Sequence, residues 1–217
     1  MPKLVAFDMD GVLVDSESSW VHIHRYFKVS NDSSVERYLR GEIDDLEFIR
    51  SDIRLWTQKE PGITANRISE ILSDVALMPG AKGVVASLKR SGYKTAIVSA
   101  GIDILAKRIA SELGIDIQLS NGLGLDGDGR LSGEGILRVR LMDKGEAVQR
   151  VANLMGVDRK DVISVGNSKY DVPMFEKSGF GIAFHPSDDI VREKADAVIE
   201  KKDLAGILEV IDNRVRR

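Results

Sequence analysis

Two carboxylates stand two residues apart in the segment VAFDMDGVLVDSE, directly after an apolar run. Phosphoryl transfer needs a nucleophile and a group that handles the proton of the leaving oxygen. Asp8 can attack phosphorus as a carboxylate, and Asp10 can carry the proton. Gly11 lets the backbone turn tightly, so that both side chains face one pocket. Single acids are common in turns, so this pair alone is weak evidence.

Three further polar clusters supply what such a pair lacks. Ser99 in VSAG can hydrogen-bond to a phosphate oxygen, and the amides after it, at the start of a helix predicted from Ile102, can donate to an anion. Lys144 in DKGEA begins another predicted helix and offers a cation to the nucleophile and the phosphate. Asp171 in GNSKYD offers a carboxylate to Mg²⁺, which prefers oxygen ligands. Together these clusters point to phosphoryl transfer.

Short apolar runs that end abruptly at polar residues must position these clusters. Such runs predict strands buried on both faces, as in a parallel sheet covered by helices. Helical spacing fills the stretches between them, so strands and helices alternate. The ligand site of such a sheet lies beyond the carboxyl ends of its strands, where the clusters fall. The predicted strands are Lys3–Phe7, Thr95–Val98 and Val162–Val165, and the predicted helices are 84–89, 104–113 and 147–155.

The segment 16–77 interrupts this alternation. It has no convincing strand but carries several amphipathic stripes at helical spacing, and a Pro-Gly turn closes it. We expect a small helical cap domain over residues 16–77, inserted after the first strand, with residues 1–15 and 78–217 forming the core domain. The alternative is that these helices pad the same domain. In the core, the glycine-rich segment 121–136 predicts a β-hairpin rather than a calcium loop, because Arg130 takes a ligand position.

Composition excludes several classes of function. The chain has 217 residues, with 31 Lys and Arg against 34 Asp and Glu, so its net charge of −3 gives no reason to expect nucleic acid or membrane binding. It has no cysteine, which excludes disulfides and thiolate metal sites. The three histidines, His22, His24 and His185, are expected to be surface or packing residues. No membrane span or signal pattern is visible, so a cytoplasmic location is expected.

The ordered set of motifs, DxDG, then S, then K, then G-x-x-x-x-D, resembles the haloacid dehalogenase superfamily of phosphohydrolases. The position of the insert, the stretch VSAGIDILAKRIASELGI, the hairpin and the C-terminal tail are most similar to phosphoserine phosphatases. The resemblance implies an α/β fold, a Rossmann-like parallel sheet flanked by helices with a helical cap. It further implies an Mg²⁺-dependent phosphatase that acts on a small phosphorylated metabolite through an aspartyl-phosphate, as a monomer or homodimer.

The resemblance also assigns roles to single residues. Asp8, Asp10 and Lys144 would be catalytic, and Glu17 would contact the substrate amine. Mg²⁺ would be held by Asp8, the backbone oxygen of Asp10, Asn167 and Asp171, and the phosphate by Ser99, Ala100, Gly101 and Lys144.

Some positions depart from the family pattern. Asn167 replaces an aspartate of the metal site, which predicts weaker metal binding, and Tyr170 replaces an asparagine. Counting places the substrate-binding arginine near Asp52, between Arg50 and Arg54, either of which could hold a substrate carboxylate or simply be a surface charge. Two other functions therefore stay open: a phosphomutase, because DGVL with a helical insert also occurs there, and a non-catalytic phosphate-binding protein.

Overall fold

The apolar run near the N-terminus forms the central strand of a parallel sheet. The computed structural model describes residues 3–215, and in this range seven strands follow the order β4-β3-β2-β1-β5-β6-β7. All neighbouring strands are parallel except β3 and β4. The strands are β1 (Lys3–Phe7), β2 (Tyr93–Ile102), β3 (Ile117–Leu125), β4 (Leu131–Ile136), β5 (Val162–Gly166), β6 (Phe180–Phe184) and β7 (Ala197–Ile199). The predicted α/β class with a mainly parallel sheet is confirmed.

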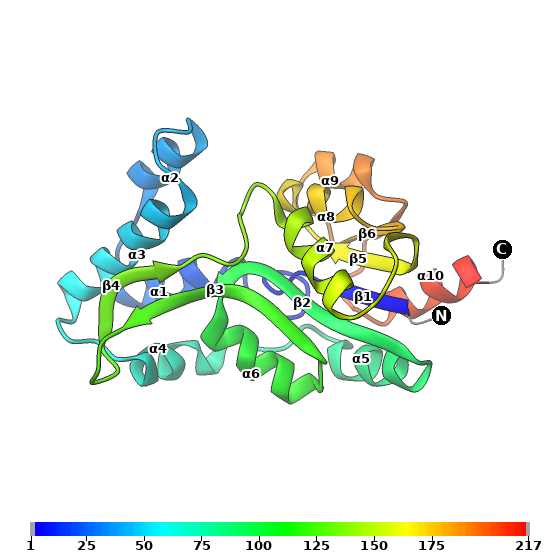
Figure 1. Ribbon diagram of the computed structural model, residues 1–217, viewed down its shortest axis with the longest axis horizontal. Coiled ribbons are helices and arrows are strands. Elements are labelled where there is room, and N and C mark those ends of the chain that lie inside the picture. Colours follow the sequence, from blue (N-terminus) through cyan, green and yellow to red (C-terminus); the bar gives the residue numbers. More distant parts are fainter. Residues whose placement is uncertain (1–2, 216–217) are drawn as a thin grey trace.

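Helices cover both faces of the sheet, which explains why β1 is apolar from Leu4 to Phe7. Val5 and Phe7 belong to the same hydrophobic cluster as α5, α6 and α10, whereas Leu4 and Ala6 pack with α7, α8 and α9. Figure 1 shows α5 and α6 on one side of the sheet and α7 to α9 on the other. The helices are α5 (Ala81–Arg90), α6 (Asp103–Leu113), α7 (Lys144–Leu154), α8 (Val172–Glu176), α9 (Asp189–Lys194) and α10 (Gly206–Val215), with short 3₁₀ turns η2 (Arg159–Asp161) and η3 (Lys169–Asp171).

The segment between the first two strands is helical, as the sequence predicts. Its helices are α1 (Ser19–Phe27), α2 (Asp32–Leu39), α3 (Asp45–Lys59), α4 (Ala65–Ile71) and the 3₁₀ turn η1 (Leu72–Asp74). The chain enters and leaves this segment through adjacent backbone stretches. Asp15 donates its N–H to the carbonyl of Ala76, and Met78 donates to Leu13, each at 2.9 Å. Figure 1 places α1 to α4 at one end of the molecule and β5 to β7 at the other.

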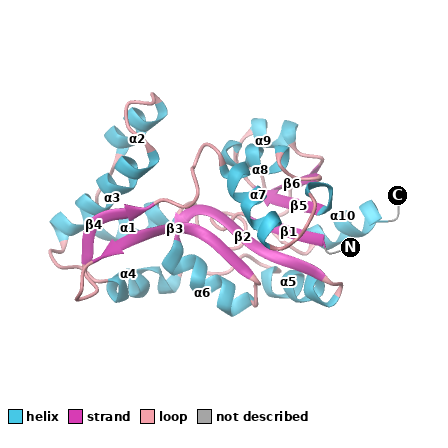
Figure 2. Ribbon diagram, viewed as in Figure 1, coloured by secondary structure: helices cyan, strands magenta, loops and turns pink. Residues whose placement is uncertain are grey.

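The β3–β4 hairpin lies beside the helical insert (Figure 2). The sequence predicts this hairpin, and the antiparallel pairing confirms it. The first half of β3 additionally pairs in parallel with β2, so the hairpin extends the main sheet. Its tip bonds to the chain before α4: Leu131 donates to the carbonyl of Ile63 at 2.8 Å, and Ala65 donates to Gly129 at 3.0 Å. A Cβ on Gly135 would come within 2.4 Å of Ile49 on α3, so the glycine lets β4 and α3 meet closely.

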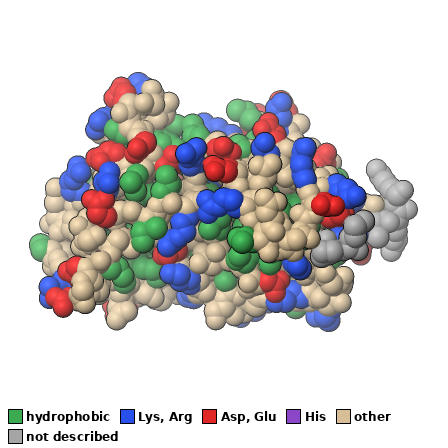
Figure 3. Space-filling view, viewed as in Figure 1, with side chains coloured by type: hydrophobic (Ala, Val, Ile, Leu, Met, Phe, Trp, Pro, Cys, Tyr) green, Lys and Arg blue, Asp and Glu red, His purple; other side chains and the backbone are tan. Residues whose placement is uncertain are grey.

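The predicted strands and helices are found with ends that differ by at most three residues, with one notable exception. β2 continues through the VSAG segment to Ile102, with a register shift between Ser99 and Ile102, so α6 begins at Asp103. The polar cluster is therefore the irregular end of a strand rather than the first turn of a helix. None of the helices within residues 3–215 is long and apolar enough to cross a membrane. Basic and acidic side chains alternate over the face shown in Figure 3.

Candidate active site

Three buried charged groups meet at the carboxyl ends of β1 and β5. Asp8 directly follows β1, Lys144 is the first residue of α7, and Asp171 lies in η3 after β5. The Lys144 ammonium lies 3.1 Å from Asp8 Oδ2 and 2.6 Å from Asp171 Oδ1. All three side chains are almost inaccessible to solvent. Burying these charges costs solvation free energy, which the attraction between the ammonium and the two carboxylates must offset. In Figure 1, this edge of the sheet faces the α1–α4 helices.

Burial sets the protonation behaviour of this cluster. Loss of solvent raises the pKa of Asp8 from 3.8 to about 7, with the Lys144 ammonium opposing the rise and the carboxyls of Asp171 and Asp10 adding to it. Burial alone would lower the pKa of Lys144, but Asp171 and Asp8 together raise it above its usual value. Lys144 therefore remains an ammonium at neutral pH and favours the carboxylate form of Asp8, which it contacts.

Asp10 is the second buried acid, and it lies in a tight turn after β1. Gly11 adopts φ +75°, the left-handed conformation that the sequence predicts, and Leu13 and Val14 both donate backbone hydrogen bonds to Met9. Desolvation raises the pKa of Asp10, and hydrogen bonds from Ser19 lower it only in part. A raised pKa allows this carboxyl to carry a proton, as a general acid must.

The predicted phosphate loop, residues 99–102, lies next to Asp10. Ser99 is buried, and its Oγ accepts a hydrogen bond from Gly101 N–H at 3.1 Å. Ile102 N–H donates to Ser19 Oγ at 3.0 Å. We expected the amides after Ser99 to be available to an anion, but those of Gly101 and Ile102 already have partners within the protein. Ser99 itself takes up the Gly101 amide, and a hydroxyl from α1, which no sequence motif indicates, takes up the Ile102 amide.

The loop after β5 is organised around Asp171. Asp171 Oδ2 accepts hydrogen bonds from Asn167 N, Ser168 N and Ser168 Oγ, and Oδ1 accepts from Lys144. The Asn167 side chain lies against Gly11, because a Cβ there would come within 2.3 Å of Asn167 Nδ2. The structure thus brings Asn167 to the turn that holds Asp8 and Asp10, while the carboxylate of Asp171 is largely committed to Lys144 and the loop.

The donor set around Asp8 and Asp10 fits a hard cation. Asp8 Oδ1 is buried without a hydrogen-bond partner among the described residues, and an uncompensated buried carboxylate oxygen is costly. Asn167 places an amide side chain against Gly11, the residue after Asp10. Over residues 3–215 the structure contains no cluster of three or more acidic or histidine side chains arranged around a metal position. A cation at this site would therefore depend on amide and backbone oxygens as well as on carboxylates.

The residues predicted to recognise substrate lie apart from this cluster. Glu17 pairs with Arg25 at 2.5 Å and is exposed. Arg50 pairs with Glu134 of β4 at 2.8 Å and also approaches Glu47, which Arg54 contacts at 3.4 Å. The two arginines share one face of α3, as predicted from their spacing.

The position between these arginines has a structural role. Asp52 is buried, and its Oδ1 lies 2.9 Å from His24 Nε2. Trp56 Nε1 donates to His24 Nδ1 at 3.0 Å, so His24 is neutral with its hydrogen on Nε2. The position near which the family pattern places a substrate-binding arginine is therefore occupied by a residue in the interior of the insert. His24 is a packing residue, as expected.

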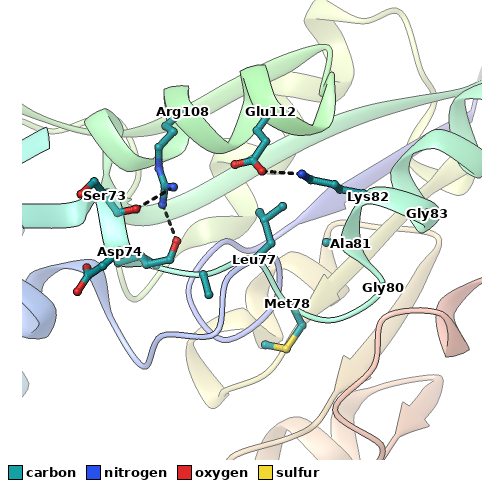
Figure 4. Close-up of a pocket in the computed structure, with 12 residues that line it drawn as sticks. Ser73, Asp74, Leu77, Met78, Gly80, Ala81, Lys82, Gly83, Arg108 and Glu112 are labelled. Atoms are coloured by element: carbon teal, nitrogen blue, oxygen red, sulfur yellow. Dashed lines mark hydrogen bonds and ion pairs between the residues drawn. The ribbon is translucent and has the colours of Figure 1, made fainter. Parts of the chain in front are cut away.

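A cavity of about 600 Å³ lies away from the cluster around Asp8 (Figure 4). It opens between the end of the helical insert, the start of α5 and α6, and none of the predicted site residues lines it. Lys82 pairs with Glu112 across it at 2.9 Å, and the Arg108 guanidinium donates to backbone carbonyls at the end of the insert, including Val75 at 2.7 Å. Its polar groups are thus mostly occupied with joining the insert to α6.

Comparison with known proteins places the chain in a family. Residues 2–179 match the sequence model of the haloacid dehalogenase-like hydrolases. The chain belongs to this family. The predicted membership of the haloacid dehalogenase superfamily, and with it the prediction of a phosphatase, is confirmed by relatives that align along nearly the whole chain.

One of these relatives is a phosphoserine phosphatase from Methanocaldococcus jannaschii, which is 30% identical over 96% of this chain and 97% of the relative. Another is a phosphoserine phosphatase from Wolinella succinogenes, which is 32% identical over 95% of this chain and 98% of the relative. A phosphoserine phosphatase from Archaeoglobus fulgidus is 34% identical over 96% of this chain, which spans 60% of that longer protein. Among solved structures, a substrate-bound phosphoserine phosphatase complex superimposes with a TM-score of 0.81 at 29% identity, covering 97% of this chain and 98% of the other.

Proposed function

We propose that this hydrolase is an Mg²⁺-dependent phosphomonoesterase that forms an aspartyl-phosphate on Asp8, with phosphoserine as its first candidate substrate. The observation that carries the proposal is the environment of Asp8. Its carboxylate is buried, one oxygen contacts the Lys144 ammonium at 3.1 Å, and the other has no partner among the described residues. A nucleophile for phosphorus needs such a free, desolvated oxygen. Relatives that carry the name phosphoserine phosphatase support the choice of substrate.

The chemistry would proceed in two balanced halves. A carboxylate oxygen of Asp8 forms a bond to phosphorus while the bond from phosphorus to the leaving oxygen breaks. The electron pair stays on that oxygen, which takes a proton from Asp10, whose raised pKa suits a proton donor. A water oxygen then forms a bond to phosphorus and gives a proton back to Asp10, while the bond from Asp8 to phosphorus breaks and its electron pair returns to the Asp8 carboxylate. The products are the alcohol and inorganic phosphate, and both carboxyls return to their starting states.

Charge compensation falls to the residues around Asp8. The Lys144 ammonium neutralises the nucleophile and attracts the phosphoryl oxygens, and the Ser99 hydroxyl can donate to one of them. Mg²⁺ would be held by Asp8, the Asp10 carbonyl, the Asn167 amide and Asp171. Bound there, it would supply positive charge to the transferring group. Because Asn167 is neutral and Asp171 is already bonded to Lys144, we expect this metal site to be weak.

Substrate choice is proposed to lie with the helical insert. We infer that residues 16–77 act as a cap domain over a core of residues 1–15 and 78–217, and that Glu17 binds the substrate ammonium while Arg50 or Arg54 binds its carboxylate. In the structure these residues pair with Arg25, Glu134 and Glu47 at the surface. Binding of a zwitterionic substrate would therefore have to exchange these surface pairs, each of modest stability, for contacts with the ligand.

A phosphatase panel tests the proposal. The purified protein is assayed with Mg²⁺ against phospho-L-serine, sugar phosphates and p-nitrophenyl phosphate, with Asp8→Asn as the matched inactive variant. We expect release of inorganic phosphate, fastest from phospho-L-serine in terms of kcat/KM, and loss of at least 99% of it in Asp8→Asn. Preference for a sugar phosphate would reject the substrate but keep the phosphatase. Isomer formation without free phosphate would indicate a mutase instead.

Asn167 favours one second candidate, a phosphate-binding protein without turnover. A neutral amide at this position weakens the charge balance on which metal-assisted transfer depends. Binding of vanadate or inorganic phosphate in calorimetry, with no hydrolysis in Mg²⁺, Mn²⁺ or Co²⁺, would support this candidate and contradict the phosphatase.

A further inference from the structure

A serine of the helical insert contacts the candidate proton donor directly. Ser19, the first residue of α1, is completely buried. Its Oγ lies 2.9 Å from Asp10 Oδ2 and accepts the N–H of Ile102 at 3.0 Å. Because the Ile102 amide can only donate, and no other acceptor for Ser19 Oγ is found among the described residues, the hydroxyl hydrogen of Ser19 points to Asp10.

This contact makes the two oxygens of Asp10 different. Oδ2 accepts the hydrogen of Ser19, whereas Oδ1 is buried and has no partner in the described part of the chain. A proton on Oδ2 would leave the Ser19 hydroxyl without an acceptor, and a buried hydrogen-bond donor without a partner is unfavourable. The proton of a neutral Asp10 therefore belongs on Oδ1, the oxygen that is free to face a reacting group.

The same turn of α1 is fixed to the phosphate loop at a second point. Trp20 Nε1 donates to the carbonyl of Ala100 at 3.0 Å, and the Trp20 ring stacks on Trp56 with centroids 5.6 Å apart. Gly101 lies between these two attachments. A Cβ on Gly101 would come within 2.6 Å of Asp10 Oδ2 and 2.8 Å of Ser19 Oγ, so the acid and the serine pack directly on the loop backbone.

We propose that Ser19 is a positioning residue for proton transfer: its hydroxyl holds the carboxyl of Asp10 against the phosphate loop, with Oδ1 turned towards the leaving oxygen. The proposal rests on the proposed phosphatase function. When the bond from phosphorus to the leaving oxygen breaks, the proton moves from Asp10 Oδ1 to that oxygen. Asp10 becomes a carboxylate, and Oδ2 keeps the hydrogen bond from Ser19 throughout. The insert thus contributes to the chemistry and not only to coverage of the site.

The test compares leaving groups that do and do not need a proton. The quantity measured is kcat/KM with phospho-L-serine, whose alkoxide must be protonated, and with p-nitrophenyl phosphate, whose phenolate leaves unaided. This constant reports the steps up to release of the first product. For Ser19→Ala we expect a loss of roughly ten-fold or more with phospho-L-serine and of less than about three-fold with the aryl ester. Ser19→Thr, which keeps the hydroxyl, should recover most of the difference.

Ser18→Ala is the matched control. Ser18 is the N-cap of the same helix and accepts from Trp20 N–H at 3.2 Å, so this variant weakens α1 without removing a bond to Asp10. It should lower both constants by one common factor. In an Asp10→Asn background, Ser19→Ala should no longer change the ratio of the two constants, because the effect passes through Asp10. Thermal unfolding of each variant verifies that it is folded. If Ser19→Ala does not fold, Ser19→Thr is compared with wild type instead.

The outcomes are distinct. If wild-type protein hydrolyses both esters and Ser19→Ala lowers both equally, the positioning role is wrong while the phosphatase stands. The same holds if the ratio still changes in the Asp10→Asn background. If wild-type protein hydrolyses neither ester, the phosphatase and the positioning role fail together.

Discussion

Replacing the candidate nucleophile should change how stability depends on pH, apart from any effect on catalysis. In the folded, metal-free protein burial raises the pKa of Asp8 from 3.8 to about 7. Between these pH values Asp8 binds a proton in the folded state that it has lost in the unfolded state. Its contribution to the free energy of unfolding is therefore complete below about pH 4 and is lost as the pH rises towards 7. Asparagine does not titrate. Asp8→Asn should therefore gain stability relative to wild type as the pH increases.

The magnitude follows from the same linkage. Each pH unit between the two values lowers the wild-type free energy of unfolding by about 1.4 kcal/mol through this group, giving an upper limit of about 4 kcal/mol. At about 2–4 °C per kcal/mol for a chain of this size, the Tm of Asp8→Asn should rise relative to wild type by roughly 10 °C from pH 4 to pH 8.

Thermal unfolding followed by circular dichroism, in the presence of a chelator, measures this difference. Asp128→Asn, at an exposed carboxylate on the hairpin tip, is the control and should show a difference from wild type that is flat with pH. Saturating Mg²⁺ should reduce the advantage of Asp8→Asn, because the cation stabilises the carboxylate form in wild type. A Tm difference for Asp8→Asn that stays constant or falls as the pH rises would refute the reasoning.

Three further predictions concern the metal, the turn and the substrate. Asn167→Asp restores a negative oxygen ligand, so the Mg²⁺ concentration at half-maximal activity should fall; an unchanged or higher value would mean that residue 167 does not face the metal. Gly11→Ala places a Cβ 2.3 Å from Asn167 Nδ2 at φ +75° and should abolish most activity. The control Gly92→Ala has a similar φ of +79° but open space around the new Cβ, so it should lower the free energy of urea unfolding by only about 1–2 kcal/mol and leave activity unchanged. Equal activity in the two variants would contradict a role of the contact between Gly11 and Asn167 in the site. Glu17→Gln should narrow the kcat/KM preference for phospho-L-serine over an aryl phosphate by roughly ten-fold, and an equal effect on both esters would contradict a role in ammonium binding.

The core of the fold could be predicted because its signal is local. β1, β2 and β5 each contain an apolar run that stops at a polar cluster. These runs predict the three central strands, and the polar clusters predict the position of the site. The strand β7 has only three residues, which are too few for such a pattern. The parallel pairing of β3 with β2 was also missed, because the glycines of this segment indicate the hairpin turn and not the neighbour on the other side.

The candidate site was predictable as far as it depends on residues at strand ends. Asp8 and Asp171 meet because parallel strands bring their carboxyl ends to one edge, and Lys144 reaches them from the start of α7. The contact between Ser19 and Asp10 has no such signal, since nothing in the sequence distinguishes this serine from Ser18 beside it. It requires α1 to fold back onto the phosphate loop.

Asp52 was difficult for a related reason. A carboxylate on the apolar face of α3 is tolerated because His24, 28 positions away, and Asn31 hydrogen-bond to it. Counting along the chain cannot reveal such compensation.

The paired backbone stretches at the two ends of the helical insert have a consequence for how this chain can be rearranged. Because Asp15 bonds to Ala76 and Met78 to Leu13, residues 15 and 76 are already neighbours, and a short peptide could join them if the segment between were deleted. The hairpin would not survive the deletion unchanged. Gly135 packs on Ile49, and Leu131 bonds to Ile63, so removing the helices would uncover β4, an edge strand of the sheet, whose backbone could pair with another chain. The insert could be deleted without separating the ends of the core, because its two ends are neighbours. Its loss would nevertheless leave a core that is prone to self-association.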